Sequence, residues 1–131
     1  MEELLLLGIS PQKIKEMILI NPMIKDMDND EIKEKVSTLK TIGCTDGQIC
    51  NIISTNSMYL DSVNDDVLNL ISYLKYIGFS NLNDLFDSNP FILNLFSYEI
   101  KDYINKRVKN KELLEDIVDD LESNPFLFDE I

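Results

Sequence analysis

One glycine recurs at a fixed interval along this chain, and it constrains the fold more than any other feature. Gly8, Gly43 and Gly78 lie 35 residues apart, and each stands between two large apolar or thiol side chains. A second marker, Asn followed by Pro or Ser, begins at residues 21, 56, 89 and 124, in steps of 35, 33 and 35. Two independent markers with one period predict a chain of repeated structural units.

The apolar residues between the markers predict two helices in each unit, because their i, i+3, i+4 spacing places them on one helix face. Aligning the third unit requires the deletion of two residues just after Phe79. The first stripe comprises Ile14, Met17 and Ile18, then Ile49, Ile52 and Ile53, then Leu82, Leu85 and Phe86, and finally Ile117, Asp120 and Leu121, where Asp120 replaces an apolar residue. The second stripe comprises Ile32, Val36 and Leu39, then Val67, Ile71 and Leu74, then Ile100 and Ile104, with Arg107 in place of the third leucine. We expect both stripes to be buried.

Residues that favour helix ends stand at the corresponding places. Ser10-Pro11 predicts an N-cap followed by proline at the first helical position, and Thr45-Asp46 and Ser80-Asn81 offer capping oxygens at the equivalent sites. Asp28 to Asp30, Asn64 and Ser97 can cap the second helices. We expect breaks near Pro22, Ser57, Pro90 and Pro125, each followed by a short apolar turn, and a left-handed glycine after the second helix.

These patterns predict an all-α fold with seven main helices and no strand. A helix pair this short cannot bury its stripe alone, so neighbouring pairs must stack. We therefore expect one domain over residues 1–131, a right-handed, curved solenoid of stacked helix pairs. Its units would span residues 8–42, 43–77 and 78–110, with a partial unit at 111–131. Because the chain starts and ends inside a unit, either its terminal repeats are trimmed caps or it is a piece of a longer array.

The same phrases resemble the repeat of the mitochondrial transcription termination factor (mTERF) family. The resemblance covers residues 4–24, 39–60 and 74–93, with a fainter copy at 113–128. It rests on a helix end with Leu and Gly, an Ile-rich helix, a Pro and paired large apolar residues. The resemblance implies a half-doughnut-like stack of helical units that binds nucleic acid along a basic concave surface, and it carries over no individual contact residue.

Charge departs from that expectation. The net charge is −12, from 12 basic and 24 acidic residues, and such a field favours basic partners over phosphate backbones and anionic membranes. One basic block stands out: Lys101, Lys106, Arg107, Lys109 and Lys111 occur with Asp102 alone as the opposing charge between residues 101 and 111. We interpret it either as a contact site for an anion or a partner, or as a set of partners for the eight acids that follow in residues 112–131.

Other residue patterns point away from catalysis and cofactors. The chain has no histidine, and it lacks a nucleophile elbow, a phosphate loop and zinc-ligand spacing, so we expect a protein that is not an enzyme and has no cofactor. Asp26, Asp28 and Asp30 match only the start of a calcium loop, so a capped helix start is the simpler interpretation. Cys44 and Cys50 are expected to remain thiols, as in a reducing, cytoplasmic compartment, and no segment predicts export or a membrane span.

The tyrosines leave two interpretations open. Tyr59, Tyr73, Tyr76, Tyr98 and Tyr103 could stack on bases. Because most of them fall within or beside apolar stripes, we expect them to pack in the core or in the groove instead, and we expect the same of Cys44 and Phe79.

Three functions fit these observations. The first is a binding scaffold for a protein with a basic surface, the second is a nucleic-acid-binding module related to transcription, and the third is an acidic mimic of nucleic acid that blocks a nucleic-acid-binding protein.

Overall fold

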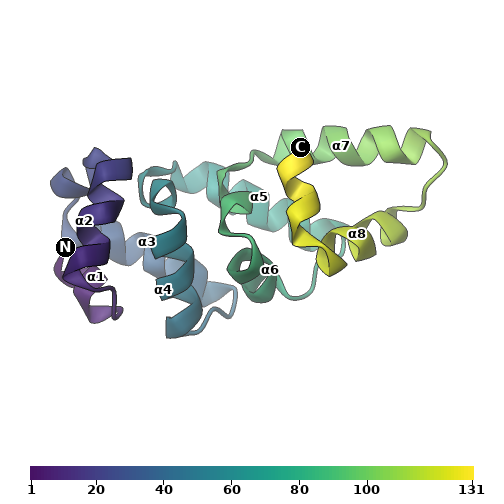
Figure 1. The fold of residues 1–131 in the computed structure, drawn as a ribbon. Helices are drawn as coiled ribbons and strands as arrows, with labels where there is room; N and C mark the ends of the chain where they lie inside the picture. Colours follow the sequence, from purple (N-terminus) through teal and green to yellow (C-terminus); the bar gives the residue numbers. More distant parts are fainter. The chain divides into compact units, whose positions relative to one another are not determined.

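The computed structural model describes residues 1–131 and contains helices and no strand (Figure 1). The α-helices are α1 (Glu2–Leu6), α2 (Pro11–Ile20), α3 (Asn29–Thr41), α4 (Asp46–Thr55), α5 (Asn64–Ile77), α6 (Leu82–Ser88), α7 (Ser97–Lys109) and α8 (Leu114–Ser123). A 3-10 helix follows each of α2, α4, α6 and α8: η1 (Pro22–Asp26), η2 (Ser57–Asp61), η3 (Pro90–Asn94) and η4 (Pro125–Glu130). The all-helical prediction and the four breaks are confirmed, and the seven main helices are α2 to α8. The chain divides into two compact units, residues 1–62 and 63–131.

The helix ends follow the predicted chemistry in part. Ser10 and Asp28 are N-caps whose side chains accept backbone N–H groups, and Thr45 forms a capping box with Gln48. The expected caps of the other helices are wrong: α6 begins after Asn81 without a side-chain cap, and Asn64 and Ser97 are themselves the first helical residues of α5 and α7. These helices are held by their buried stripes, which makes a cap dispensable.

Backbone geometry confirms the role of the recurring glycine. All three repeat glycines have positive φ, between 91° and 116°, which L-residues with a side chain rarely adopt. After α7 the same left-handed place is taken by Lys111, with a φ of 68°. This lysine of the basic block therefore bears backbone strain that glycine avoids in the preceding repeats.

The core of the N-terminal unit is formed by the stripes of α2, α3 and α4 together with η1 and η2. α3 packs against α1, α4 and η2, and α2 packs against α4. Of the predicted core residues in this unit, Ile14, Ile32, Val36, Ile49 and Ile53 are buried. Ile18 is only half-buried, and the prediction for it is wrong, because Met17 on the adjacent helix position is the residue that enters the core.

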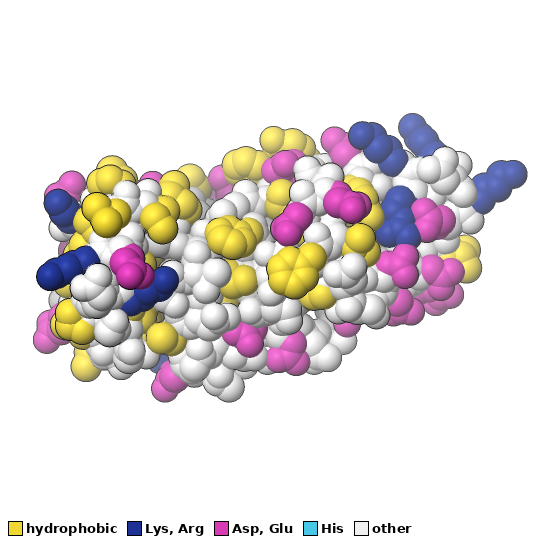
Figure 2. Space-filling view, in the orientation of Figure 1, with side chains coloured by type: hydrophobic (Ala, Val, Ile, Leu, Met, Phe, Trp, Pro, Cys, Tyr) yellow, Lys and Arg dark blue, Asp and Glu magenta, His cyan; other side chains and the backbone are white.

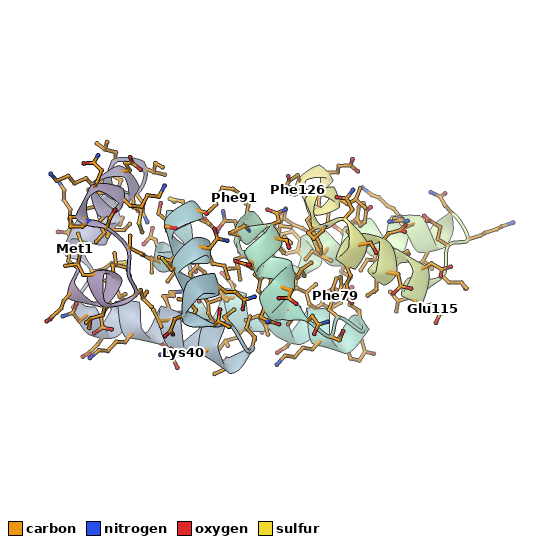
Figure 3. All side chains as sticks on the ribbon, turned by 60° about the horizontal axis from the view of Figure 1, so that its bottom comes forward. Met1, Lys40, Phe79, Phe91, Glu115 and Phe126 are labelled. Atoms are coloured by element: carbon orange, nitrogen blue, oxygen red, sulfur yellow. The ribbon has the colours of Figure 1, made fainter.

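The C-terminal unit repeats this arrangement. α7 packs against α5 and α8, and η3 packs against α5, α6 and η4. All ten apolar stripe residues of this unit are buried: Val67, Ile71, Leu74, Leu82, Leu85, Phe86, Ile100, Ile104, Ile117 and Leu121. Phe79 and Phe128 add an aromatic contact with ring centroids 6.1 Å apart, and Figure 3 labels Phe79 inside the packed helices.

The asparagine marker has a tertiary role in both units. Asn21 is 2% exposed, and its Nδ2 donates to the carbonyl of Ser57, 3.1 Å away in η2. Asn89 is 1% exposed, and its Nδ2 donates to the carbonyl of Pro125 at 3.1 Å and to Oδ1 of Asp129 at 3.0 Å, both in η4. The marker that ends a helix therefore also ties η1 to η2 in the first unit and η3 to η4 in the second.

Candidate functional site

The basic block lies along α7 and in the loop after it. The helix begins where Glu99 accepts the backbone N–H of Phe96 at 3.0 Å, and its core-facing side carries Ile100 and Ile104. The opposite side carries Tyr98, Lys101, Asn105 and Lys109, which are all exposed and follow i, i+3, i+7, i+11 spacing. The fold thus separates the block into an outward set of lysines and one inward arginine.

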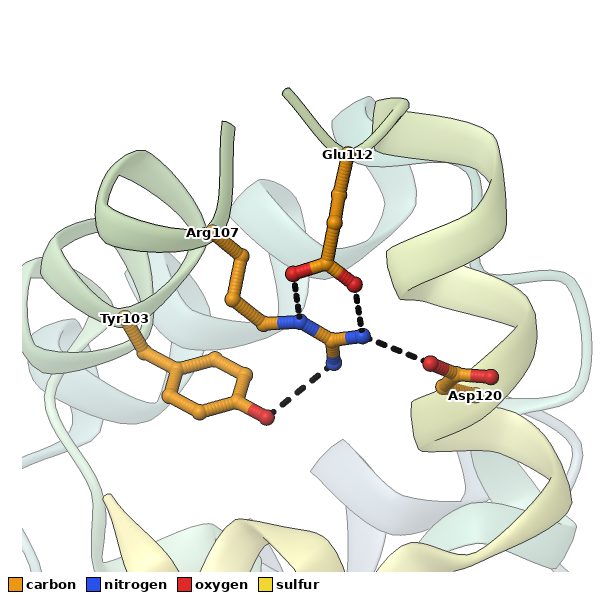
Figure 4. A network of polar contacts seen from close by, with 4 residues as sticks. All are labelled: Tyr103, Arg107, Glu112 and Asp120. Atoms are coloured by element: carbon orange, nitrogen blue, oxygen red, sulfur yellow. Dashed lines mark hydrogen bonds and ion pairs between the residues drawn. The ribbon is translucent and has the colours of Figure 1, made fainter. Parts of the chain in front are cut away.

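Arg107 points toward α8 and is neutralised there (Figure 4). Its guanidinium makes a bidentate pair with Glu112, with N···O distances of 2.8 and 2.6 Å, and a 2.6 Å bond to Asp120. Tyr103 accepts a fourth bond from Nη1 at 3.1 Å, and its ring lies 5.6 Å from the guanidinium carbon. With four hydrogen bonds to groups within the protein, Arg107 joins two helices and is not an exposed contact for a ligand.

This network shifts the protonation equilibria of its members. The hydrogen bonds from Arg107 lower the pKa of the Glu112 carboxyl below its usual range. The bonds to Glu112 and Asp120 in turn raise the pKa of Arg107, which stays charged. Because the folded state holds Glu112 in its ionised form, the contribution of this pair to stability is present above the ordinary glutamate pKa of about 4.3.

We expect Glu112→Gln to flatten the acid dependence of stability. In the native protein this contribution should be lost as the pH falls from about 4.3 through the lowered pKa of folded Glu112. The free energy of unfolding, measured by urea titration at several acidic pH values, should therefore fall less steeply in the variant. Glu115→Gln, an exposed change in α8, is the control and should keep the native slope. Equal slopes for all three proteins would contradict the assignment.

The lysines of the block are open to solvent. Lys101, Lys106, Lys109 and Lys111 are exposed, and none of them makes an ion pair. Figure 2 shows basic side chains gathered at the end of α7, with acidic side chains on neighbouring surface. Lys101 has a preferred position, because its Nζ lies 5.5 Å from the centroid of the Tyr73 ring. These four cations are the part of the predicted site that a ligand can reach.

Two tyrosines lie outside the core, contrary to expectation. Tyr59 is fully buried, and Tyr73 and Tyr103 are half-buried, but Tyr76 is 87% exposed and Tyr98 is 62% exposed. The Tyr98 ring stacks on Phe96 with centroids 5.6 Å apart and an interplanar angle of 6°. Tyr98 lies two residues before the Ile100–Ile104 stripe, which is close in sequence but on the other side of the helix.

Sequence reasoning also missed a buried lysine in the N-terminal unit. Lys35 on α3 is 5% exposed. Its Nζ donates hydrogen bonds to the carbonyl and to Oγ of Ser62, and it lies 5.6 Å from the centroid of the Tyr59 ring. Desolvation lowers the pKa of Lys35, although Glu34 and Asp61 act in the opposite direction. The hydroxyl of Tyr59 donates to the carbonyl of Lys35 at 2.7 Å, and burial raises the pKa of that phenol. Both side chains hold the end of η2 against α3, which is a structural role.

The remaining candidates do not form a chemical site. Asp28 caps α3, as its simpler interpretation predicted, and no group of His, Cys, Asp and Glu is arranged to hold a metal ion. Cys44 is buried, Cys50 is half-buried, and neither is in a disulfide. No helix has the length and apolar character needed to cross a bilayer. An open cleft of about 260 Å³ beside α7 is lined by Glu99, Asp102, Tyr103, Lys106, Glu130 and Ile131, and its acidic lining disfavours an anion.

Comparison with protein families decides the relationship that the repeat suggested. The mTERF family model matches residues 1–120. The chain belongs to the mTERF family. A search of curated proteins found no match. The match covers nearly all of the chain, including α7 and its lysines, and it confirms the resemblance inferred from the recurring Gly and Asn-Pro phrases.

Proposed function

We propose that this mTERF-family chain is a non-enzymatic module that binds nucleic acid and that the exposed lysines of α7 and the following loop are its contact. The family match carries the proposal, because it favours a nucleic-acid-binding, transcription-related role. The lysines of the basic block are the candidate contacts for phosphates, since Lys101, Lys106, Lys109 and Lys111 are exposed cations without an ion-pair partner. Arg107, the fifth member of the block, supports the site by fastening α7 to α8.

The number of these cations limits the affinity. Four phosphate contacts release about four counterions, so the slope of log K against log salt should be no steeper than about −3 for a single strand. The net charge of −12 adds long-range repulsion, which salt screens only beyond a Debye length of about 8 Å at physiological ionic strength. The expected binding is therefore weak, local and best seen at low salt.

Binding should be detectable at low salt and absent for duplex DNA at physiological salt. We expect fluorescence anisotropy to show binding at about 20 mM salt and no measurable duplex binding at about 150 mM. Sub-micromolar duplex affinity at the higher salt would contradict a local contact. The charge reversal Lys106→Glu with Lys109→Glu should abolish the low-salt binding. Lys13→Glu with Lys15→Glu, exposed in α2, makes the same change in net charge and should weaken binding much less.

A protein partner with a basic surface is the second candidate. The observation that favours it is a pair of exposed phenylalanines at equivalent places in the C-terminal unit, which Figure 3 shows on one edge. Phe91 is 50% exposed in η3, Phe126 is 62% exposed in η4, and the two 3-10 helices pack together. A partner captured by salt-sensitive pull-down should be lost on Phe91→Ala with Phe126→Ala and retained on Leu68→Ala, an exposed residue of α5.

We further propose that the helix pairs stack as a curved, right-handed solenoid, as the 35-residue recurrence predicts. Small-angle X-ray scattering tests this, because a single rigid curved body gives one narrow distribution of interatomic distances. Two independently moving parts would give a broader distribution with a longer maximum dimension.

A further inference from the structure

We propose that the outward face of α7 binds unpaired nucleotides, with Tyr98 and Phe96 stacking on a base and Lys101 and Lys109 contacting phosphates. This inference rests on the proposed nucleic-acid function and adds the strand type and the residues that select it. Three observations support the inference: the geometry of the aromatic pair, the lysines that follow it along α7, and the acidic residues beside this helix face.

The stacked rings of Phe96 and Tyr98 form a solvent-exposed aromatic platform on which a base can extend the stack. The rings of Phe96 and Tyr98 are almost parallel, with a 6° interplanar angle, and they are 42% and 62% exposed. Exposed rings of this kind are stacking partners for bases, because every base has a π-face, and the interaction tolerates any sequence. A base inside a duplex already stacks on its neighbours, so only an unpaired base can use the platform.

The lysines continue from the platform along the same helix face. Lys101 lies one turn after Tyr98, and its Nζ is placed over the Tyr73 ring. Lys109 lies eleven residues after Tyr98, about 16 Å further along the helix axis. A strand whose base stacks on Tyr98 would therefore pass Lys101 and reach Lys109 while following α7.

The acids beside this face disfavour a second strand. The cleft on one flank of α7 is lined by Glu99, Asp102 and Glu130. α8, which packs against α7, belongs to the segment 112–131 with eight acids and no base. A duplex would bring its second backbone toward all of these carboxylates, whereas a single strand that contacts Lys101 and Lys109 passes only Asp102, which is exposed on the same face of α7.

The test compares strand types with variants of single exposed residues. Fluorescein-labelled oligo(dT), oligo(U) and a DNA duplex of equal length are titrated with the full chain at about 20 mM salt, where few-contact binding is strongest. We expect both single strands to bind more tightly than the duplex. Tyr98→Ala should weaken single-strand binding by at least about fivefold, the lower end for loss of one base stack. Tyr76→Ala, which removes a more exposed tyrosine from α5, is the matched control and should bind as the native chain does.

A conservative variant gives a direct readout of stacking. The chain contains no tryptophan, so Tyr98→Trp introduces a single indole at the platform. We expect this variant to keep the single-strand affinity and its fluorescence to be quenched when oligo(dT) binds. Duplex binding as tight as single-strand binding, unchanged affinity in Tyr98→Ala, or an indole signal that does not respond would each overturn the inference. Those results leave the proposed nucleic-acid function standing, whereas no binding to any of the three probes would overturn both.

Discussion

Phe86→Ala is expected to lower the free energy of unfolding of the C-terminal unit by about 3–5 kcal/mol. Phe86 is 0% exposed and belongs to α6, which has only seven residues and therefore depends on the packing of its stripe. Removing the ring deletes its apolar contacts and leaves a cavity that such a short helix can close only by shifting. A loss of this size is a large fraction of the 5–15 kcal/mol that stabilises a typical domain.

Urea unfolding followed by circular dichroism measures this effect, with Phe91→Ala as the control. Phe91 lies in η3 of the same unit and is 50% exposed, so the same substitution should cost much less, about 1 kcal/mol or below. Equal costs for the two variants would contradict the assignment of the α6 stripe to the core. Because the chain has two compact units, Phe86→Ala should also separate the unfolding curve into two transitions if the units unfold independently.

Asn89→Ala should destabilise the protein by about 1–3 kcal/mol. The Asn89 side chain is buried, and its Nδ2 donates to the carbonyl of Pro125 and to Asp129. The substitution leaves that carbonyl without this donor in a part-buried place and releases η4 from η3. The cost of a missing partner exceeds the small net value of an ordinary exposed hydrogen bond.

The same marker supplies its own control. Asn124 occupies the equivalent position at the end of α8 and is exposed, so Asn124→Ala should change the stability little. Thermal or urea unfolding of the two variants distinguishes a buried tertiary tie from a simple helix stop. If both substitutions had the same effect, the recurrence of Asn would reflect only local helix termination.

Much of the fold follows from local rules that the sequence states directly. The i, i+3, i+4 stripes predict which faces are buried, and eighteen of the nineteen apolar stripe residues are buried, Ile18 being the exception. Proline and glycine end the helices at the predicted places because their backbone constraints are intrinsic. Side-chain caps were predicted less well, since a helix held by tertiary packing begins where its stripe begins, with or without a capping oxygen.

The exposed platform shows where local rules stop. Tyr98 lies two residues before Ile100, and Tyr76 lies two residues after Leu74, so both were expected in the core. In a helix, two residues correspond to a rotation of about 200°, which turns such a neighbour to the opposite face. Whether that face meets another helix or solvent depends on which elements pack around it, and the sequence does not state this.

The sequence alone determined the helices, their ends and the two places where the repeat loses its pattern. Arg107 stands where Leu39 and Leu74 stand in the earlier repeats, and Asp120 stands where the α8 stripe should be apolar. Only the tertiary structure showed that these departures meet, with 2.6 Å between Nη2 of Arg107 and Oδ2 of Asp120. Their separation of 13 residues is closed by the turn between α7 and α8, which packs the two helices together. A charge in an apolar stripe requires a partner within hydrogen-bonding distance, and helix periodicity constrains only its own helix.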